Sequence, residues 1–269
     1  MNGTLAYVYA VARDLPALAA SVADLPGVSG GPVRLVRAEP GDDVAALVSD
    51  VTAADFAEEP LKRHMEDLDW LETVARAHHG VVEAAAQGTT VLPLRLATVY
   101  LDDDRVRAML AAHRRAFADR LDRLARHTEW GVKLYVEAPA REEQQPAAAA
   151  GTGRDYLRMR RAQRGSREDA YRAAQGAAAR VEEAARGHAV DRVRHRPQQG
   201  TLARGPGENI VNDAYLVPQR EAEAFREDVT RAVAAQGVRV EITGPWVPYS
   251  FAAPPSEEPR QAPDGTTGP

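Results

Sequence analysis

The chain shows two successive runs of apolar stretches and helical segments, and each run predicts a compact α+β unit. In the first run, glycine and proline clusters separate short apolar or alternating stretches from segments with helical spacing. The expected strands are residues 5–11, 33–37, 45–51 and 91–100, and the expected helices are residues 16–24 and 60–87. The order βαββαβ predicts a ferredoxin-like sandwich, an antiparallel sheet with two helices on one face.

The helix expected over residues 60–87 is the main packing helix of this unit. Apolar residues recur along it at intervals of three and four, which is typical of a helix with one buried face. They are Leu61, Met65, Leu68, Leu71 and Ala75, with Trp70, Val74 and Val81 beside them. In the following strand Pro93 lacks a backbone donor, so we expect it at a sheet edge or at the start of the strand.

A helix over residues 102–127 is expected to join this unit to a second one. Asp102, Asp103 and Asp104 favour a helix N-terminus, and an apolar face that includes His113 and Phe117 follows them. The pattern then repeats, and a second modified ferredoxin-like unit is expected. Its strands are residues 130–137, 189–195, 210–217 and 238–243, and its helices are residues 154–186 and 219–235.

Length and composition agree with two domains. The chain has 269 residues, of which 44% are hydrophobic, enough for two cores. The expected divisions are a domain over 1–101, a connecting helix over 102–127, a domain over 128–251 and a disordered tail over 252–269, which is rich in proline and glycine.

Composition also narrows the functional classes. The chain has no cysteine, which excludes disulfides and a thiol nucleophile. Its net charge of -5 argues against bulk nucleic-acid binding. No apolar run approaches the roughly 20 residues of a membrane span, so we expect a soluble cytoplasmic protein with no membrane contact.

Candidate catalytic or metal-binding groups are few. The histidines, at 64, 78, 79, 113, 127, 188 and 195, follow no metal-ligand spacing, and no glycine-rich phosphate loop is present, so no cofactor is expected. His64 lies near Glu66, Asp67 and Asp69, but these carboxylates fan around a helix instead of converging. His78 is interpreted as a core or boundary histidine.

Two further patterns leave alternatives open. The arginines between 154 and 167 form a basic stretch of helix, which favours an acidic protein partner or a solvated surface over nucleic acid. Because ferredoxin-like folds host many functions, a small-molecule or catalytic site using His78, Arg95 and Glu129 near the end of a sheet is the alternative hypothesis.

The segment from Val238 to Phe251 is the most informative part of the chain. Val238, Val240 and Ile242 alternate with charged residues, which predicts a half-buried strand that ends at Thr243-Gly244-Pro245. Two prolines then frame an aromatic group. It consists of Trp246, Tyr249 and Phe251. Aromatic side chains ordinarily serve packing, so the segment is expected to pin itself onto the domain.

Several motifs together resemble the GvpF/GvpL family of gas vesicle proteins, in the same order along the chain. They are Tyr7-Val-Tyr-Ala-Val11, Trp70-Leu-Glu with His78, Val91-Leu-Pro-Leu-Arg-Leu-Ala-Thr-Val99, Glu129-Trp-Gly-Val-Lys-Leu-Tyr135, Asn212-Asp-Ala-Tyr-Leu-Val217 and Thr243-Gly-Pro-Trp-Val-Pro-Tyr-Ser-Phe251. Many members carry Pro-Phe-Arg-Phe-Gly-Thr where this chain has Pro93-Leu-Arg-Leu-Ala-Thr98, which leaves the F or L subtype open.

The resemblance implies a non-enzymatic accessory or minor structural protein of gas vesicles that binds the shell protein GvpA and other accessory proteins during assembly. It implies location at the gas vesicle, in the cytoplasm, and it fixes no oligomeric state. The family-signature residues are Pro93, Arg95, Trp130, Tyr215, Trp246, Tyr249 and Phe251. Trp246 and Tyr249 are expected to anchor the last segment between the domains, with an exposed contact for a partner as the alternative role.

Overall fold

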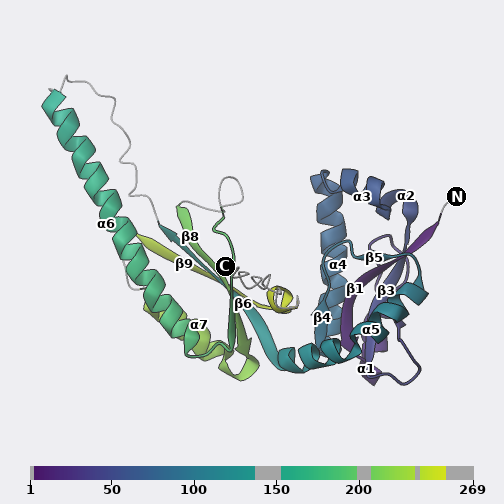
Figure 1. Ribbon diagram of the computed structural model, residues 1–269. Coiled ribbons are helices and arrows are strands. Elements are labelled where there is room, and N and C mark those ends of the chain that lie inside the picture. The colour runs from purple at the N-terminus through teal and green to yellow at the C-terminus, as the bar shows by residue number, and fades with distance from the viewer. Residues whose placement is uncertain (1–2, 137–152, 199–206, 234–236, 253–269) are drawn as a thin grey trace, which may run out of the picture.

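The computed structural model describes residues 3–136, 153–198, 207–233 and 237–252. It has a mixed α+β fold with two antiparallel sheets, as the sequence predicts. Figure 1 shows each sheet with its own helices in one half of an elongated molecule. The predicted tail falls on residues outside those described, apart from Ala252.

The first sheet is built around β1 (Thr4–Arg13), whose side chains are buried along almost its whole length. Its strand order is β2-β3-β1-β4, and β5 also pairs with β1. The partner strands are β2 (Arg34–Val36), β3 (Val44–Thr52), β4 (Val91–Pro93) and β5 (Val99–Tyr100). All pairs are antiparallel, with Tyr7 opposite Ser49 at the centre.

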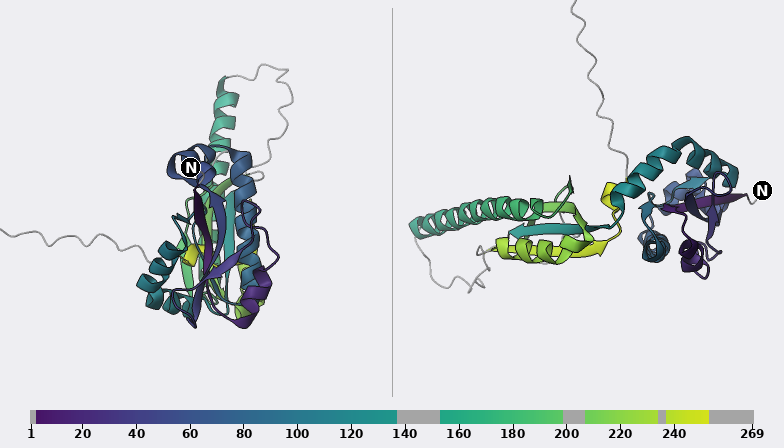
Figure 2. Two further views of the ribbon diagram at one scale, coloured as in Figure 1. Left: turned by 90° about the vertical axis from the view of Figure 1, so that its right-hand side faces the viewer. Right: turned by 90° about the horizontal axis from the view of Figure 1, so that it is seen from below.

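Helices cover both faces of the first sheet (Figure 2). On one face lie α1 (Pro16–Val22) and α4 (Leu68–Gly88), which pack with Tyr7, Tyr9 and other core residues. On the other face lies α5 (Asp103–Leu124), packed on the opposite side chains of β1 and β3. The helix expected to connect two domains therefore forms a third layer of the first half. Near its end, Leu121 and Leu124 belong to the same core cluster as Leu216 of the second half.

The long helix predicted over 60–87 is in fact two helices, and its predicted buried face is correct for Val74 and Val81 but wrong for Met65 and Leu68. α3 (Glu58–His64) follows the short α2 (Ala53–Phe56), and a break precedes α4. Asp67 caps α4 by accepting hydrogen bonds from the backbone N–H groups of Asp69 and Trp70. The break leaves Met65 44% and Leu68 77% exposed. The buried face is formed by Val74, His78, Val81, Val82 and Ala85.

Two other predictions in this half need correction. The strand predicted over 91–100 is interrupted after Pro93, and Ala97 has a positive φ of 60° within the intervening turn. Pro93 does lie in an edge strand, as predicted. His113 was assigned to the apolar face of α5, but it is exposed, and its ring lies at the margin of that face with its centroid 6.0 Å from that of Phe117.

The second sheet repeats the strand order of the first. Its order is β7-β8-β6-β9, with every pair antiparallel. Its elements are β6 (His127–Val136), α6 (Gly153–Arg186), β7 (Asp191–Arg194), β8 (Glu208–Pro218), the 3-10 turn η2 (Gln219–Glu221), α7 (Ala222–Ala232), β9 (Val238–Trp246) and the 3-10 turn η3 (Tyr249–Phe251).

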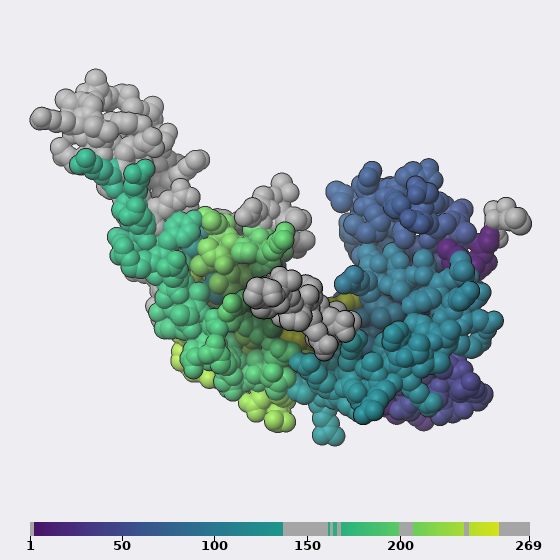
Figure 3. Space-filling view, viewed as in Figure 1, coloured from purple at the N-terminus to yellow at the C-terminus, as the bar shows by residue number. Residues whose placement is uncertain are grey.

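The second core lies between this sheet and the C-terminal part of α6 together with α7. Trp130, Phe225 and Val181 are among its fully enclosed members. The N-terminal part of α6 projects away from the sheet (Figures 1 and 3). Arg161 and Arg164 are exposed there. The side chains of the other predicted arginines, at 154, 158, 160 and 167, lie outside the described set. Within the described residues no helix is long and apolar enough to cross a membrane.

The cap of α4 gives a stability prediction. Replacing Asp67 by Ala removes both side-chain hydrogen bonds at the helix start, which should cost about 1 kcal/mol of stability. The neighbouring exposed carboxylate Glu66 makes no such bond, so Glu66→Ala is the matched control. Urea unfolding should show a lower midpoint for Asp67→Ala only, and equal midpoints for the two variants would contradict the cap.

Candidate functional site at the junction of the two halves

The last strand carries the chain from the second half to the first. β9 does not end at Thr243, as the sequence predicts, but continues to Trp246, which pairs with Glu129. The register shifts at this point, and Gly244 has a φ of 133°. A Cβ atom on Gly244 would lie 2.8 Å from the Glu129 carbonyl oxygen and 3.1 Å from the Trp130 ring. Only glycine allows this close approach, so the strand can bend and still pair.

Beyond β9, residues 247–252 place apolar side chains against both cores of the first half. Val247 and Tyr249 pack on the cluster beneath α1 and α4. Phe251 and Ala252 pack on the cluster beneath α5. The segment therefore joins the end of the second sheet to both layers of the first half.

A polar anchor holds the middle of this segment. The Glu129 carboxylate accepts hydrogen bonds from the Ser250 backbone N–H at 2.8 Å and from its hydroxyl at 2.7 Å. Nε2 of His195 lies 3.1 Å from the same hydroxyl oxygen. Burial raises the pKa of the Glu129 carboxyl, and the two Ser250 bonds and the nearby His195 oppose that shift. The three residues of the anchor therefore come from β6, from η3 and from the segment that follows β7.

The rings of Tyr7, His78 and His79 in the first half lie next to this segment and form a ring row with Tyr249. His78 is 3% exposed, and its Nδ1 is 3.0 Å from the Tyr7 hydroxyl. That hydroxyl accepts a hydrogen bond from the Ala97 N–H, so its proton is directed to His78. Burial, followed by the neighbouring His79, lowers the pKa of His78 to about 4, so its imidazole is neutral near pH 7.

Tyr249 extends this row from the C-terminal segment. Its ring centroid is 6.5 Å from that of His78 and 5.9 Å from that of His79. Its hydroxyl is 3.4 Å from Nδ1 of His79, whose Nε2 is 3.0 Å from Glu83. Burial, with a smaller effect of Glu83, raises the pKa of the Tyr249 hydroxyl. Tyr249 is therefore a neutral, partly enclosed contact between η3 and α4.

The structure places the predicted signature residues in different environments. Trp246, Tyr249 and Phe251 lie in the junction, and Trp246 is 44% exposed with its ring 6.2 Å from His79. Trp130 and Tyr215 belong to the second core. Pro93 is buried in β4, and Arg95 is exposed on the turn after it. Pattern analysis missed Ser250, His195 and His79 because no local spacing marks a contact between distant segments.

The three residues of the alternative site have separate surroundings. His78 bonds to Tyr7, Glu129 bonds to Ser250, and Arg95 projects from an exposed turn. Within the described residues these three side chains share no hydrogen bond or ion pair with one another. His78 and Glu129 are thus each held by a different partner.

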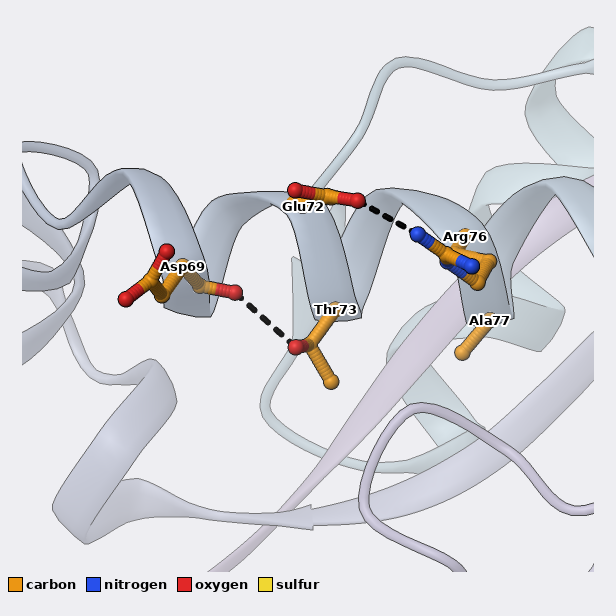
Figure 4. Close-up of a pocket in the computed structure, with 5 residues that line it drawn as sticks. All are labelled: Asp69, Glu72, Thr73, Arg76 and Ala77. Carbon is orange, nitrogen blue, oxygen red and sulfur yellow. Dashed lines mark hydrogen bonds and ion pairs between the residues drawn. The ribbon is translucent and has the colours of Figure 1, made fainter.

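A separate hollow of about 520 Å³ lies on the exposed face of α4 (Figure 4). It is lined by Asp69, Glu72, Thr73, Arg76 and Ala77. Arg76 pairs with Glu72, and the Thr73 hydroxyl donates to the Asp69 carbonyl, so the polar groups satisfy one another along a single helix. Nor do the described residues contain a group of three side chains suited to hold a metal ion. The hollow has no set of converging groups, and the junction remains the candidate site.

The anchor gives a graded stability prediction. Glu129→Ala should lower the free energy of unfolding by about 1 to 3 kcal/mol, because it leaves the Ser250 N–H without its acceptor. Ser250→Ala keeps that backbone bond and should cost less. Urea unfolding measures both, and limited proteolysis should cleave near residue 250 sooner in Glu129→Ala. A larger loss for Ser250→Ala would contradict the anchor.

The raised pKa of Glu129 also predicts a pH dependence. The folded state holds this proton more tightly than the unfolded chain, so the contribution of Glu129 to stability falls as pH rises from its ordinary pKa of 4.5 through the raised folded value. Glu129→Gln removes this fall. The stability difference, variant minus native, should therefore increase with pH across that window and stay constant above it. Glu223→Gln, on the exposed face of α7, is the control, and a flat difference for Glu129→Gln would contradict the prediction.

Comparison with known proteins identifies the family of the chain. A family model described as gas vesicle synthesis protein GvpL/GvpF matches residues 5–253. Gas vesicle protein L of Streptomyces sp. (strain CB03234) is 43% identical over 258 residues, covering 94% of this chain and 95% of that protein. Gas vesicle protein F of the same strain is 29% identical over 258 residues, covering 91% and 98%.

Solved structures show the same fold. The crystal structure of gas vesicle protein GvpF from Anabaena sp. PCC7120 matches with a TM-score of 0.65 at 16% identity, over 94% of this chain and 98% of that one. GvpF from Microcystis aeruginosa matches with a TM-score of 0.60 at 17% identity, over 93% and 99%. With a family model that spans nearly its whole length and a relative 43% identical over 94% of it, the chain belongs to the GvpL/GvpF family of gas vesicle synthesis proteins.

Proposed function

We propose that this protein takes part in gas vesicle assembly as a non-enzymatic accessory component that binds the shell protein GvpA and other accessory proteins. The observation that carries the proposal is the family match over residues 5–253. The names of the relatives, gas vesicle proteins L and F, support the same pathway. The site of action would be the gas vesicle and its surroundings in the cytoplasm.

We also propose a fold for each half and a division of the chain into domains. Each half is interpreted as a modified ferredoxin-like unit, because both sheets have the order second, third, first, fourth strand with all neighbours antiparallel. The proposed divisions remain 1–101, 102–127 and 128–251, with α5 packed on the first unit. A protein with two such units joined by a fixed segment can present one rigid surface to a partner.

We further propose that the chain is an L-type member. Two relatives come from the same Streptomyces strain, and the chain is 43% identical to gas vesicle protein L and 29% identical to gas vesicle protein F, over 258 residues in each case. The motif Pro93–Thr98 lacks the two phenylalanines that many family members carry there, and by itself it leaves the F or L subtype open.

The surface proposed to bind the vesicle partner surrounds Trp246. Its indole is 44% exposed at the end of β9, whereas Tyr249 three residues later is enclosed by the ring row. The two residues therefore differ in the role that we assign to them. Tyr249 anchors the segment, and Trp246 is available as an interface contact, a position in which tryptophan is enriched.

Trp246→Ala tests this assignment. We expect the melting temperature to change little, because the side chain is largely outside the core, and binding to purified GvpA to weaken about 30-fold, as for a strong interface contact. Binding is measured by pull-down and by titration. In a strain that lacks the gene, the variant should restore fewer vesicles than the native chain.

Tyr249→Ala is the matched aromatic control at the enclosed position and should lower the melting temperature. A large stability loss in Trp246→Ala would instead assign Trp246 to packing. Absence of binding between the native chain and every vesicle protein, together with normal vesicles in the deletion strain, would refute the proposed function.

A further inference from the structure

The two sheets differ in how they protect their edges. An edge strand has outward backbone N–H and C=O groups that can pair with another strand, and proteins commonly keep such strands short or interrupt them with proline. In the first sheet β2 has three residues, and β4 has three and ends in Pro93. In the second sheet β7 has four residues, three of them charged. Each of these edges follows the protective pattern.

The remaining edge, β9, does not follow it. It has nine residues at the margin of the second sheet, next to β6 (Figure 1). Pro245 and the register shift come only near its end, so Val238 to Thr243 form a regular strand. None of these six residues is fully buried. In the described part of the chain, no further strand pairs with the outer side of β9.

The side chains of β9 alternate between two environments. Val238, Val240 and Ile242 pack against the second core. Arg239 and Glu241 point to the opposite face of the sheet, where the Arg239 guanidinium carbon lies 4.1 Å from the centre of the Tyr135 ring. Arg239 and Glu241 are also 3.4 Å apart from nitrogen to oxygen along the strand.

The side chains of β9 complement those of a second β9 strand that runs in the opposite direction. If two copies of β9 lie antiparallel with Val240 opposite Val240, Val238 faces Ile242 of the second copy. Arg239 then faces Glu241 of the second copy, and the reverse pair forms by symmetry. Directly opposite residues have Cβ atoms about 4.5 to 5.5 Å apart, whereas alternate residues of one strand are roughly 6.6 Å apart. In this pairing Arg239 is therefore closer to Glu241 of the second copy than to Glu241 of its own strand.

Other registers lack this complementarity. Centring the pair on Arg239 places two arginines opposite each other, and centring it on Glu241 places two glutamates opposite each other. A shift by one residue sets core-facing side chains against outward-facing ones. A closed twofold dimer requires the same strand from both copies in antiparallel orientation. Charge and apolar pattern therefore select one register.

We propose that β9 is a docking edge for a second copy of this chain, which pairs antiparallel about Val240 and joins two second sheets into one. The apolar row of Val238, Val240 and Ile242 then continues across the twofold axis on the helix-covered side. On the other side two Arg239–Glu241 pairs cross the interface. This self-association goes beyond the proposed function and does not depend on which vesicle protein the chain binds.

Charge reversal with rescue tests the register. The native protein at about 100 µM, well above the micromolar range of many modest interfaces, should sediment with twice the 29.1 kDa monomer mass. Arg239→Glu and Glu241→Arg each place like charges opposite one another twice, so each should weaken dimerisation roughly tenfold or more. The double swap Arg239→Glu with Glu241→Arg restores both opposite pairs and should recover the native dissociation constant.

The matched control is Arg226→Glu, which makes the same charge change on the exposed face of α7 and should leave dimerisation unchanged. Circular dichroism and melting curves establish that each variant is folded, and if one single reversal unfolds, the other carries the test. A native protein that stays monomeric at this concentration would overturn the proposal. So would a dimer that tolerates both single reversals, or one that the double swap fails to restore.

A crosslink gives an independent measurement, because the chain has no cysteine. Val240→Cys places one thiol beside its own copy at the twofold axis, and mild oxidation should give a covalent dimer. Ala224→Cys, on the exposed face of α7, should give little crosslink under the same conditions. Equal crosslinking by the two variants would overturn the Val240-centred pairing.

Discussion

The two hydrogen bonds from Ser250 to the half-buried Glu129 carboxylate are the interaction on which the rest of the arrangement depends. They fix the C-terminal segment at the point where β9 leaves the second sheet. From there Val247 and Tyr249 enter one layer of the first half, and Phe251 and Ala252 enter the other. A carboxylate that is partly withdrawn from water costs free energy when it has no hydrogen-bond partner. The polar bond therefore sets the position of the segment, and the apolar contacts on both sides supply most of the burial.

The first half offers a prepared surface for this segment. Tyr7 binds the turn after β4 through Ala97 and binds α4 through His78, so one hydroxyl links a strand, a turn and a helix. Burial keeps His78 neutral near pH 7, and the ring row then continues to Tyr249 without an unpaired charge. The same arrangement explains why three residues of the C-terminal signature have separate roles. Tyr249 and Phe251 are held by the first half, while Trp246 stays largely at the surface.

β9 connects the two surfaces proposed for interaction. Its regular part, Val238 to Thr243, offers an unprotected edge with a self-complementary pattern, and its irregular end carries Trp246. Gly244 separates these parts, because the bend that it allows lets the strand leave the sheet margin and cross to the first half. Self-association and partner binding can therefore occupy neighbouring parts of one strand without competing for the same residues.

The sequence alone determined the order of the main strands and helices, the alternation in Val238 to Ile242 and the family, and it gave a sheet edge as one of two places for Pro93, because these features depend on periodicity, on local motifs and on proline's missing donor. It did not determine that the helix over 60–87 breaks before Leu68, because a capping Asp67 and a continuous apolar stripe compete within the same window. Nor did it show that α5 covers the first sheet, or that Glu129 binds Ser250 across 121 positions. Only the tertiary structure decided which of the signature aromatics are enclosed and which is exposed. That outcome depends on long-range packing against the first half, and local spacing carries no record of such contacts.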